Sequence, residues 1–180
     1  EMRISRRLTR RLPAFVAAGC LLALLAGCAT LSVSHLESKP IAAGPPTVIA
    51  MKYWRFEFSG ALSGQSFVIR GRATPVTGDL PPWVDRAEEV TFAAYLRDPA
   101  GNVLAKAEKT YPGMPLAPDA AVPFEFVLDP AGSAAGDYAV SFGYRTLFGS
   151  AKARSALGAK SGPPPAGSVV FVGEGAVLKH

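Results

Sequence analysis

Apolar and polar side chains alternate with a period of two along several short stretches between residues 51 and 149. In residues 52–58, for example, Trp54, Phe56 and Phe58 occupy every second position. Successive side chains of a β-strand point to opposite faces of its sheet, so this alternation is typical of strands with one buried face. The same period continues in later stretches, at residues 66–73, 90–98, 103–110, 122–128 and 138–144.

Turn residues separate these stretches at regular intervals. Residues 98–102 read Asp-Pro-Ala-Gly-Asn, in which proline presets the first turn angle and glycine adopts a positive φ at little cost. Two further short strands are expected at 169–172 and 176–178, joined by Gly-Glu-Gly at 173–175. Since no long stretch has the period of an amphipathic helix, we predict an all-β fold, an antiparallel β-sandwich.

Composition divides the rest of the chain into segments. Residues 28–50 are rich in Ser, Thr, Ala, Gly and Pro, which is typical of a flexible tether. Residues 150–167 begin with small and basic side chains and end in a Pro-rich run, which indicates a linker or long loop, with a short basic helix as the alternative. Residues 168–180 are expected to form a C-terminal hairpin that completes the sandwich of residues 51–149.

Positive charge is concentrated at the start of the chain. The whole sequence has 19 Lys and Arg against 14 Asp and Glu, a formal charge of +5. Residues 1–27 hold five arginines and one acid, so this segment carries +4 of that total and residues 28–180 carry +1. If the segment is removed on maturation, the remaining chain lacks the basic surface that nucleic-acid binding needs. We therefore expect no nucleic-acid partner.

Residues 1–27 have the order of a bacterial export signal. The arginines precede an apolar run from Leu12 to Ala26. As a helix this run would be about 22 Å long at about 1.5 Å per residue, short of the ~30 Å hydrocarbon core of a membrane. It ends in Leu25-Ala26-Gly27-Cys28, which resembles the lipobox of bacterial lipoproteins. Cys20, after Ala-Ala-Gly, is a poorer match to the same box.

The lipobox resemblance implies the chemistry and location of the N-terminus. It implies cleavage before Cys28, a diacylglyceryl group on the Cys28 sulfur and an acyl chain, such as palmitate, on the new amino group. The mature chain has no other cysteine, so no intramolecular disulfide can form. Ala29 stands where an Asp would resemble an inner-membrane retention signal of Gram-negative bacteria. We expect a lipid-anchored protein of the cell envelope, on the periplasmic face of the outer membrane or the cell surface.

A second resemblance concerns the sandwich itself. Residues 136–140, Gly-Asp-Tyr-Ala-Val, are similar to the start of strand F in immunoglobulin-like and fibronectin-like domains, where a tyrosine binds back to the backbone. Tyr138 would fill that place. The chain has no Cys-Trp-Cys framework, which excludes an antibody-type domain. Its general plan is also similar to the tethered transthyretin-like lipoprotein of type VI secretion, so a transthyretin-like sandwich is the alternative.

Catalytic chemistry has little support in the sequence. His35 lies in the tether and His180 at the C-terminus, and no Cys or His cluster has the spacing of metal ligands. The carboxylates Asp85, Glu88 and Glu89 cluster before a strand and are interpreted as a solvated loop. We expect no enzyme, no metal and no cofactor apart from the acyl groups on Cys28. A hydrolase using Asp85 or Glu89 is the last alternative.

Two predicted loops carry large apolar side chains suited to contact with a partner. Trp83 lies in Leu-Pro-Pro-Trp-Val at 80–84, and Tyr111 and Met114 lie in Tyr-Pro-Gly-Met-Pro-Leu at 111–116. Exposed aromatic side chains on stiff loops bury much area at little entropic cost. The first hypothesis is therefore a non-catalytic interaction or assembly module that binds another envelope protein.

The second hypothesis is a glycan- or peptide-binding module. Sandwich faces that present aromatic and basic side chains can bind sugars by stacking and hydrogen bonding. The candidates are the outward positions of two predicted strands, provided that the two strands share an exposed face: Tyr53, Arg55, Tyr95 and Arg97.

Overall fold

The computed structural model divides the chain into two compact units. Of the first, Glu1–Thr30 with Leu178–His180, only Thr30, Leu178 and Lys179 are described. The second, Leu31–Val177, contains the sheets. The strands β1 (Thr30–Ser32) and β11 (Val177–Lys179) each extend across this division. The structure describes residues 30–42, 44–117, 119–130, 136–156 and 169–179.

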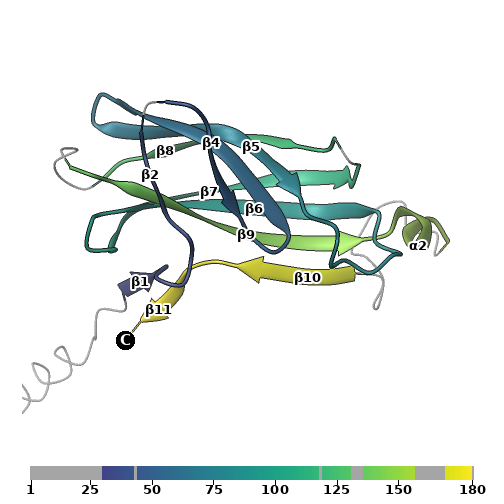
Figure 1. Cartoon of the computed structure of the whole chain (residues 1–180). Coiled ribbons are helices and arrows are strands. Elements are labelled where there is room, and N and C mark those ends of the chain that lie inside the picture. The colour runs from purple at the N-terminus through teal and green to yellow at the C-terminus, as the bar shows by residue number, and fades with distance from the viewer. Residues whose placement is uncertain (1–29, 43, 118, 131–135, 157–168, 180) are drawn as a thin grey trace, which may run out of the picture. The chain divides into compact units, whose positions relative to one another are not determined.

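Two antiparallel sheets lie face to face in the second unit (Figure 1). Their strands are β2 (Lys39–Pro40), β3 (Thr47–Ala50), β4 (Trp54–Ser63), β5 (Ser66–Pro75), β6 (Arg86–Arg97), β7 (Val103–Pro115), β8 (Val122–Leu128), β9 (Ala139–Gly149) and β10 (Val169–Glu174). Within the described residues, the β4 sheet has the order β3-β4-β5-β8, and the β9 sheet has the order β10-β9-β6-β7 with β2 beside β9. The predicted all-β fold of antiparallel sheets is confirmed, and it is consistent with a β-sandwich.

Aromatic side chains from both sheets fill the space between them. The Trp54 and Phe92 rings meet edge to face with centroids 4.8 Å apart, and Phe56 stacks on Phe142 at 4.6 Å. The Trp54 Nε1–H group donates a hydrogen bond of 2.8 Å to Thr146 Oγ1 across the core. Burial of every second residue in β4 and β8 follows the alternation in the sequence, so the predicted inward faces of both strands are confirmed.

The prediction of a flexible tether is wrong for the described residues 31–42 and 44–50. β2 pairs with β9, and β3 pairs with β4. Val33 and Leu36 are buried in a second apolar cluster with Ala93 and Tyr95. These few apolar side chains among many small and polar residues secure the segment to the sheets, and the folded unit begins near Leu31 rather than at residue 51. Residues 28 and 29 lie outside the described part of the chain.

Strand β6 is buried on both faces, although its alternation predicted one exposed face. The inward residues pack in the core, while Thr91, Ala93 and Tyr95 on the other face are also buried. Leu31 and Ala176 pack against the cluster that contains Ala93 and Tyr95. The outer face is covered because segments distant in sequence lie over it.

Residues 111–115 of the loop expected at residues 111–116 are part of β7 instead. Tyr111 lies opposite Val90, and Met114 lies opposite Ala87. Pro112 and Pro115 are tolerated here because β7 is at the edge of the β9 sheet, where one side of the strand needs no ladder hydrogen bonds.

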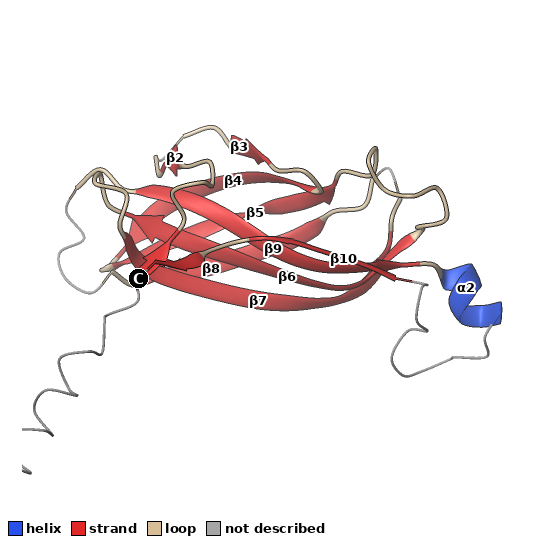
Figure 2. Cartoon of the chain, turned by 90° about the horizontal axis from the view of Figure 1, so that it is seen from below, coloured by secondary structure: helices blue, strands red, loops and turns tan. Residues whose placement is uncertain are grey.

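The expected C-terminal hairpin is also wrong. β10 pairs with β9 along its whole length, from Val169 opposite Gly149 to Glu174 opposite Tyr144. The alternative of a short helix after β9 holds for α2 (Ala151–Ala156), which lies at one end of the sheets (Figure 2). The rest of the predicted linker, residues 157–167, lies outside the described part of the chain.

Candidate functional site

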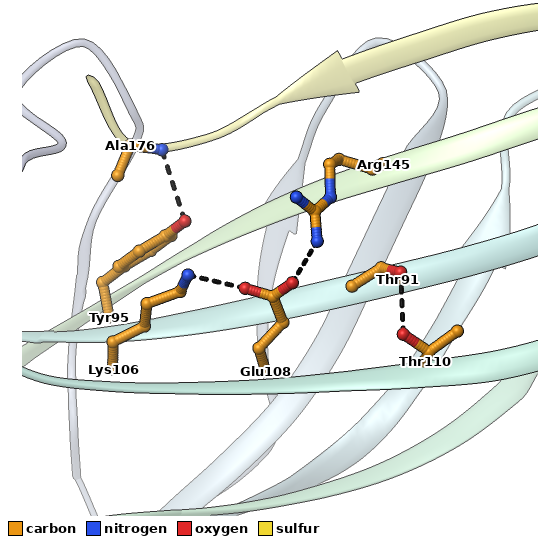
Figure 3. A network of polar contacts seen from close by, with 7 residues as sticks. All are labelled: Thr91, Tyr95, Lys106, Glu108, Thr110, Arg145 and Ala176. Carbon is orange, nitrogen blue, oxygen red and sulfur yellow. Dashed lines mark hydrogen bonds and ion pairs between the residues drawn. The ribbon is translucent and has the colours of Figure 1, made fainter. Parts of the chain in front are cut away.

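A groove lies on the outer face of the β9 sheet, the face turned away from the core. Figure 3 shows some of the side chains that line it. Its cavity volume is about 340 Å³. We call it the outer groove. Its lining residues come from β6, β7, β9, β10 and the chain beside them: Leu31, Thr91, Ala93, Tyr95, Lys106, Glu108, Gly143, Tyr144, Arg145, Phe171, Gly173, Glu174, Gly175 and Ala176.

Small residues make the groove hollow. Ala93 lies opposite Glu108 of β7 on one side and opposite Gly143 of β9 on the other. Ala93 and Gly143 form the floor of the groove because their side chains are small or absent, and Glu108 is part of its polar wall. A Cβ atom on Gly143 would lie 2.9 Å from the Glu174 carbonyl oxygen, which is too close. Gly143 therefore allows the chain that follows β10 to lie against the floor of the groove.

An ion-pair network forms one wall. The Glu108 carboxylate accepts a hydrogen bond from the Lys106 ammonium group at 2.6 Å and also pairs with the Arg145 guanidinium (Figure 3). The hydrogen bond from Lys106 lowers the pKa of Glu108 below its ordinary value, and the charge of Arg145 lowers this pKa further. Two cations share one carboxylate, so the wall has one net positive charge and several N–H donors left for a ligand.

Hydroxyl groups extend this network along the sheet. The hydroxyl oxygens of Thr91 and Thr110 lie 2.9 Å apart, and the Tyr95 hydroxyl accepts a hydrogen bond from the Ala176 backbone N–H at 3.3 Å (Figure 3). At the rim, Phe171 is 68% exposed. The groove therefore combines cations, hydroxyl groups and an aromatic side chain. Its two carboxylates already have partners, because Glu108 pairs with Lys106 and Arg145, and Glu174 accepts a hydrogen bond from the Tyr144 hydroxyl.

The four predicted ligand-face residues do not share a face. Arg55 lies on β4 and Tyr53 directly precedes that strand, whereas Tyr95 and Arg97 lie on β6 in the other sheet. Tyr95 is only 4% exposed and lines the outer groove. Arg97 donates to the Gly101 carbonyl at 3.4 Å and to Ser141 Oγ at 3.3 Å, which fixes the turn after β6.

The predicted partner-binding residues are also separated. Trp83 is 43% exposed in the segment between β5 and β6 and stays a candidate. Tyr111 and Met114 are half-buried and pack against the core. Their place in β7 favours a packing role over contact with a partner.

The loop carboxylates have structural contacts. Asp85 Oδ1 accepts a hydrogen bond from the Ala151 backbone N–H at 2.8 Å, at the first residue of α2. Glu88 pairs with Arg86 at 3.3 Å, and Glu89 is exposed on β6. Asp85 therefore satisfies a backbone donor at a helix start, where a carboxylate is favourable.

The described residues contain no group of three or more His, Cys, Asp or Glu placed to hold a metal ion. In the same part of the chain, no helix has the length and apolar character needed to cross a membrane. Cys28 and the predicted export signal, residues 1–27, lie outside the described residues. No protein-family model matches the chain, and no curated protein sequence matches it.

The sequence pattern did not identify most of the groove residues as candidates for a binding site. Lys106 and Glu108 lie on β7, Arg145 lies on β9, and Phe171 lies on β10. The one feature of the sequence that pointed to this site was the opposite charge of side chains at outward positions of two predicted strands. Pairing Glu108 with Arg145, 37 positions apart, requires the strand order, which the alternation does not supply.

Two tyrosines at the edges of the core differ in whether their hydroxyl groups have a hydrogen-bond partner, so removing each hydroxyl is expected to change stability differently. The Tyr111 hydroxyl is buried without a hydrogen-bond partner among the described residues, and burial raises its pKa. The Tyr144 hydroxyl donates a hydrogen bond of 2.9 Å to Glu174 Oε1. Burial is the main cause that raises the pKa of Tyr144 above its ordinary value, and the hydrogen bond to Glu174 raises this pKa further. We expect Tyr111→Phe to leave the free energy of unfolding unchanged or raise it by about 1 kcal/mol, and Tyr144→Phe to lower it by about 1–3 kcal/mol.

Urea unfolding of both variants beside the wild type measures this difference. Equal losses from the two substitutions would contradict the assignment of an unpartnered hydroxyl to Tyr111.

Proposed function

We propose that this protein is a lipid-anchored lipoprotein of the bacterial cell envelope and acts as a non-catalytic interaction module. The lipobox at 25–28 and the near-neutral charge of residues 28–180 support the anchor and argue against a nucleic-acid partner. With Cys28 holding the protein at the membrane, the folded unit is left to bind an envelope protein or a larger assembly.

The observation that carries the binding role is the outer groove. Two strands, β7 and β9, contribute Lys106, Glu108 and Arg145 to one connected network, and β10 adds an exposed Phe171 beside it. Arginine and aromatic side chains are enriched among residues that dominate binding energy. The outer face of the β4 sheet also has ion pairs, such as Arg70 with Glu125, but each of them joins only two directly opposed residues.

This comparison defines the experiment. Arg145→Gln and Arg70→Gln each neutralise an arginine that pairs with a glutamate on the outer face of a sheet. In full-length protein purified from detergent-solubilised membranes, we expect Arg145→Gln to reduce recovery of the partner at least about tenfold, because an interface arginine typically contributes ~2 kcal/mol. Arg70→Gln is expected to leave recovery unchanged. Equal recovery with both variants would contradict the role of the groove.

A glycan- or peptide-binding module is the second candidate, and the donor-rich lining of the groove favours it. Arg145 and Lys106 retain N–H donors, whereas both oxygens of Glu108 already accept. Such a surface prefers acceptor-rich, anionic ligands. Titration with an oligogalacturonate and with its neutral galactose counterpart tests this candidate. Binding of the acidic sugar alone supports it, and no binding of either at millimolar concentration counts against it.

We also propose that the sandwich is immunoglobulin-like rather than transthyretin-like. In immunoglobulin-like sandwiches, strand B neighbours E in one sheet, and F lies between C and G in the other. Assigning β5, β8, β6, β9 and β10 to strands B, E, C, F and G reproduces these neighbours. Tyr138 directly precedes β9, the place of the corner tyrosine at the start of strand F.

A further inference from the structure

Strand β10 is an edge strand that lacks the usual protection against pairing. It has six residues, of which only Glu174 at its end is charged and none is proline. Within the described residues it pairs only with β9. Its outward Phe171 is 68% exposed, while Val170 and Val172 pack against the core. Apolar, uncharged edges of this kind are ready to pair with another strand.

The other edges of the two sheets are protected. β7 carries two lysines at Lys106 and Lys109 together with Pro112, and β8 carries Pro123 and Glu125. β3 has only four residues. Charge, proline and shortness are the features by which edge strands avoid unwanted pairing. Among the described edge strands of these two sheets, β10 therefore lacks this protection.

We propose that β10 pairs antiparallel with β10 of a second copy of this chain, about a twofold axis at Phe171. Directly opposed residues of antiparallel strands point to the same face, so Val170 and Val172 must oppose one another to keep both cores closed. This register places Phe171 opposite the partner's Phe171 on the outer face, where two aromatic side chains stabilise a strand pair.

Charge placement favours a second copy as the occupant. Glu174, the one charged side chain of β10, lies beyond the paired residues 169–173 at opposite ends of the two strands. The two carboxylates therefore do not oppose each other, and the edge is self-complementary, as a twofold interface requires. Phe171 also lines the outer groove, so pairing adds the partner's Phe171 to the rim. This inference goes beyond the proposed function and does not depend on it.

Cysteine cross-linking in the full chain tests the register. Opposed Cα atoms of antiparallel strands lie about 4.5–5.5 Å apart, within the ~4.4–6.8 Å range that a disulfide spans. We expect Phe171→Cys to give a covalent dimer in oxidised membranes. Val127→Cys on the β8 edge, where Val127 is 50% exposed, is the matched control and is expected to give none. Wild-type protein is the background control, because any dimer that it gives must be cross-linked through the one cysteine of the mature chain, Cys28.

Absence of a dimer from Phe171→Cys, or equal dimer from Val127→Cys, would overturn the proposal. A Gly173→Cys variant that cross-links more than Phe171→Cys would overturn the register.

A charge placed on the edge provides a second measurement. Phe171→Lys puts two like charges opposite each other in the pair, so we expect the dimer dissociation constant of purified full-length protein to rise at least about tenfold in sedimentation. Val127→Lys is expected to leave it unchanged, and circular dichroism confirms that both variants fold. A wild-type protein that stays monomeric at its highest soluble concentration would overturn the pairing. The recovery of the partner protein by the Arg145→Gln variant, described above, tests the outer groove independently of this dimer.

Discussion

Replacing Cys28 with serine is expected to move nearly all of the protein from the membrane fraction to the soluble envelope fraction. Serine has no thiol to accept the diacylglyceryl group, and without the acyl chains the protein loses about 0.8 kcal/mol for each CH₂ buried in the bilayer. The near-neutral charge of residues 28–180 supplies no electrostatic attraction that could substitute for the lipid. Fractionation of cells that express the full chain, followed by immunoblotting, measures the change.

Cys20→Ser is the matched control, because Cys20 follows a poorer box in the same segment. We expect this variant to stay at the membrane with the wild-type mobility on gels. Retention of Cys28→Ser at the membrane, or release of Cys20→Ser instead, would contradict the assignment of the anchor.

Phe142→Ala is expected to lower the free energy of unfolding by about 3–5 kcal/mol, the usual cost of removing a buried aromatic ring. Phe142 is fully buried on β9 and stacks on Phe56 of the facing sheet at 4.6 Å. It also meets Phe58 and Phe124 edge to face, at 5.1 and 5.4 Å. The loss is a large part of the ~5–15 kcal/mol that stabilises a typical domain.

Phe171→Ala makes the same substitution at a ring that is 68% exposed. Its cost is expected to stay within about 0.5 kcal/mol. Urea unfolding of the two variants, under conditions where the protein is monomeric, compares them directly. Similar losses would contradict the central place of Phe142 in the core.

The inward faces of β4 and β8 were predictable because each strand follows its alternation without interruption. Trp54, Phe56 and Phe58 in β4, and Phe124 and Phe126 in β8, are all buried. Period-two burial depends on local geometry alone, so a single sequence is sufficient to identify it.

The covering of the β9 sheet was not predictable in the same way. Tyr95 is buried because Val33 and Ala176 lie near it in the fold, although both are more than 60 positions away in sequence. Likewise, the prolines of β7 indicate a loop until the strand is known to be an edge. Burial that comes from distant segments leaves no periodic signal in the strand that it covers.

The candidate site depends on strand order even more strongly. Lys106 and Glu108 belong to one hairpin and could be paired from sequence, but Arg145 reaches Glu108 only because β9 and β7 flank β6. Phe171 joins the groove only because β10 adds to β9 instead of forming a hairpin. The groove is therefore a product of the sheet topology, which the sequence pattern alone left open.

Site-specific photo-cross-linking in cells tests most directly whether the outer groove is the binding surface of the anchored protein. A photoreactive amino acid replaces Lys106 in the groove wall or, as control, Val127 on the opposite sheet, in the full-length chain. If the groove binds a partner, position 106 gives a cross-linked product of higher mass and position 127 gives none. No product from position 106, or an equal product from position 127, would contradict it.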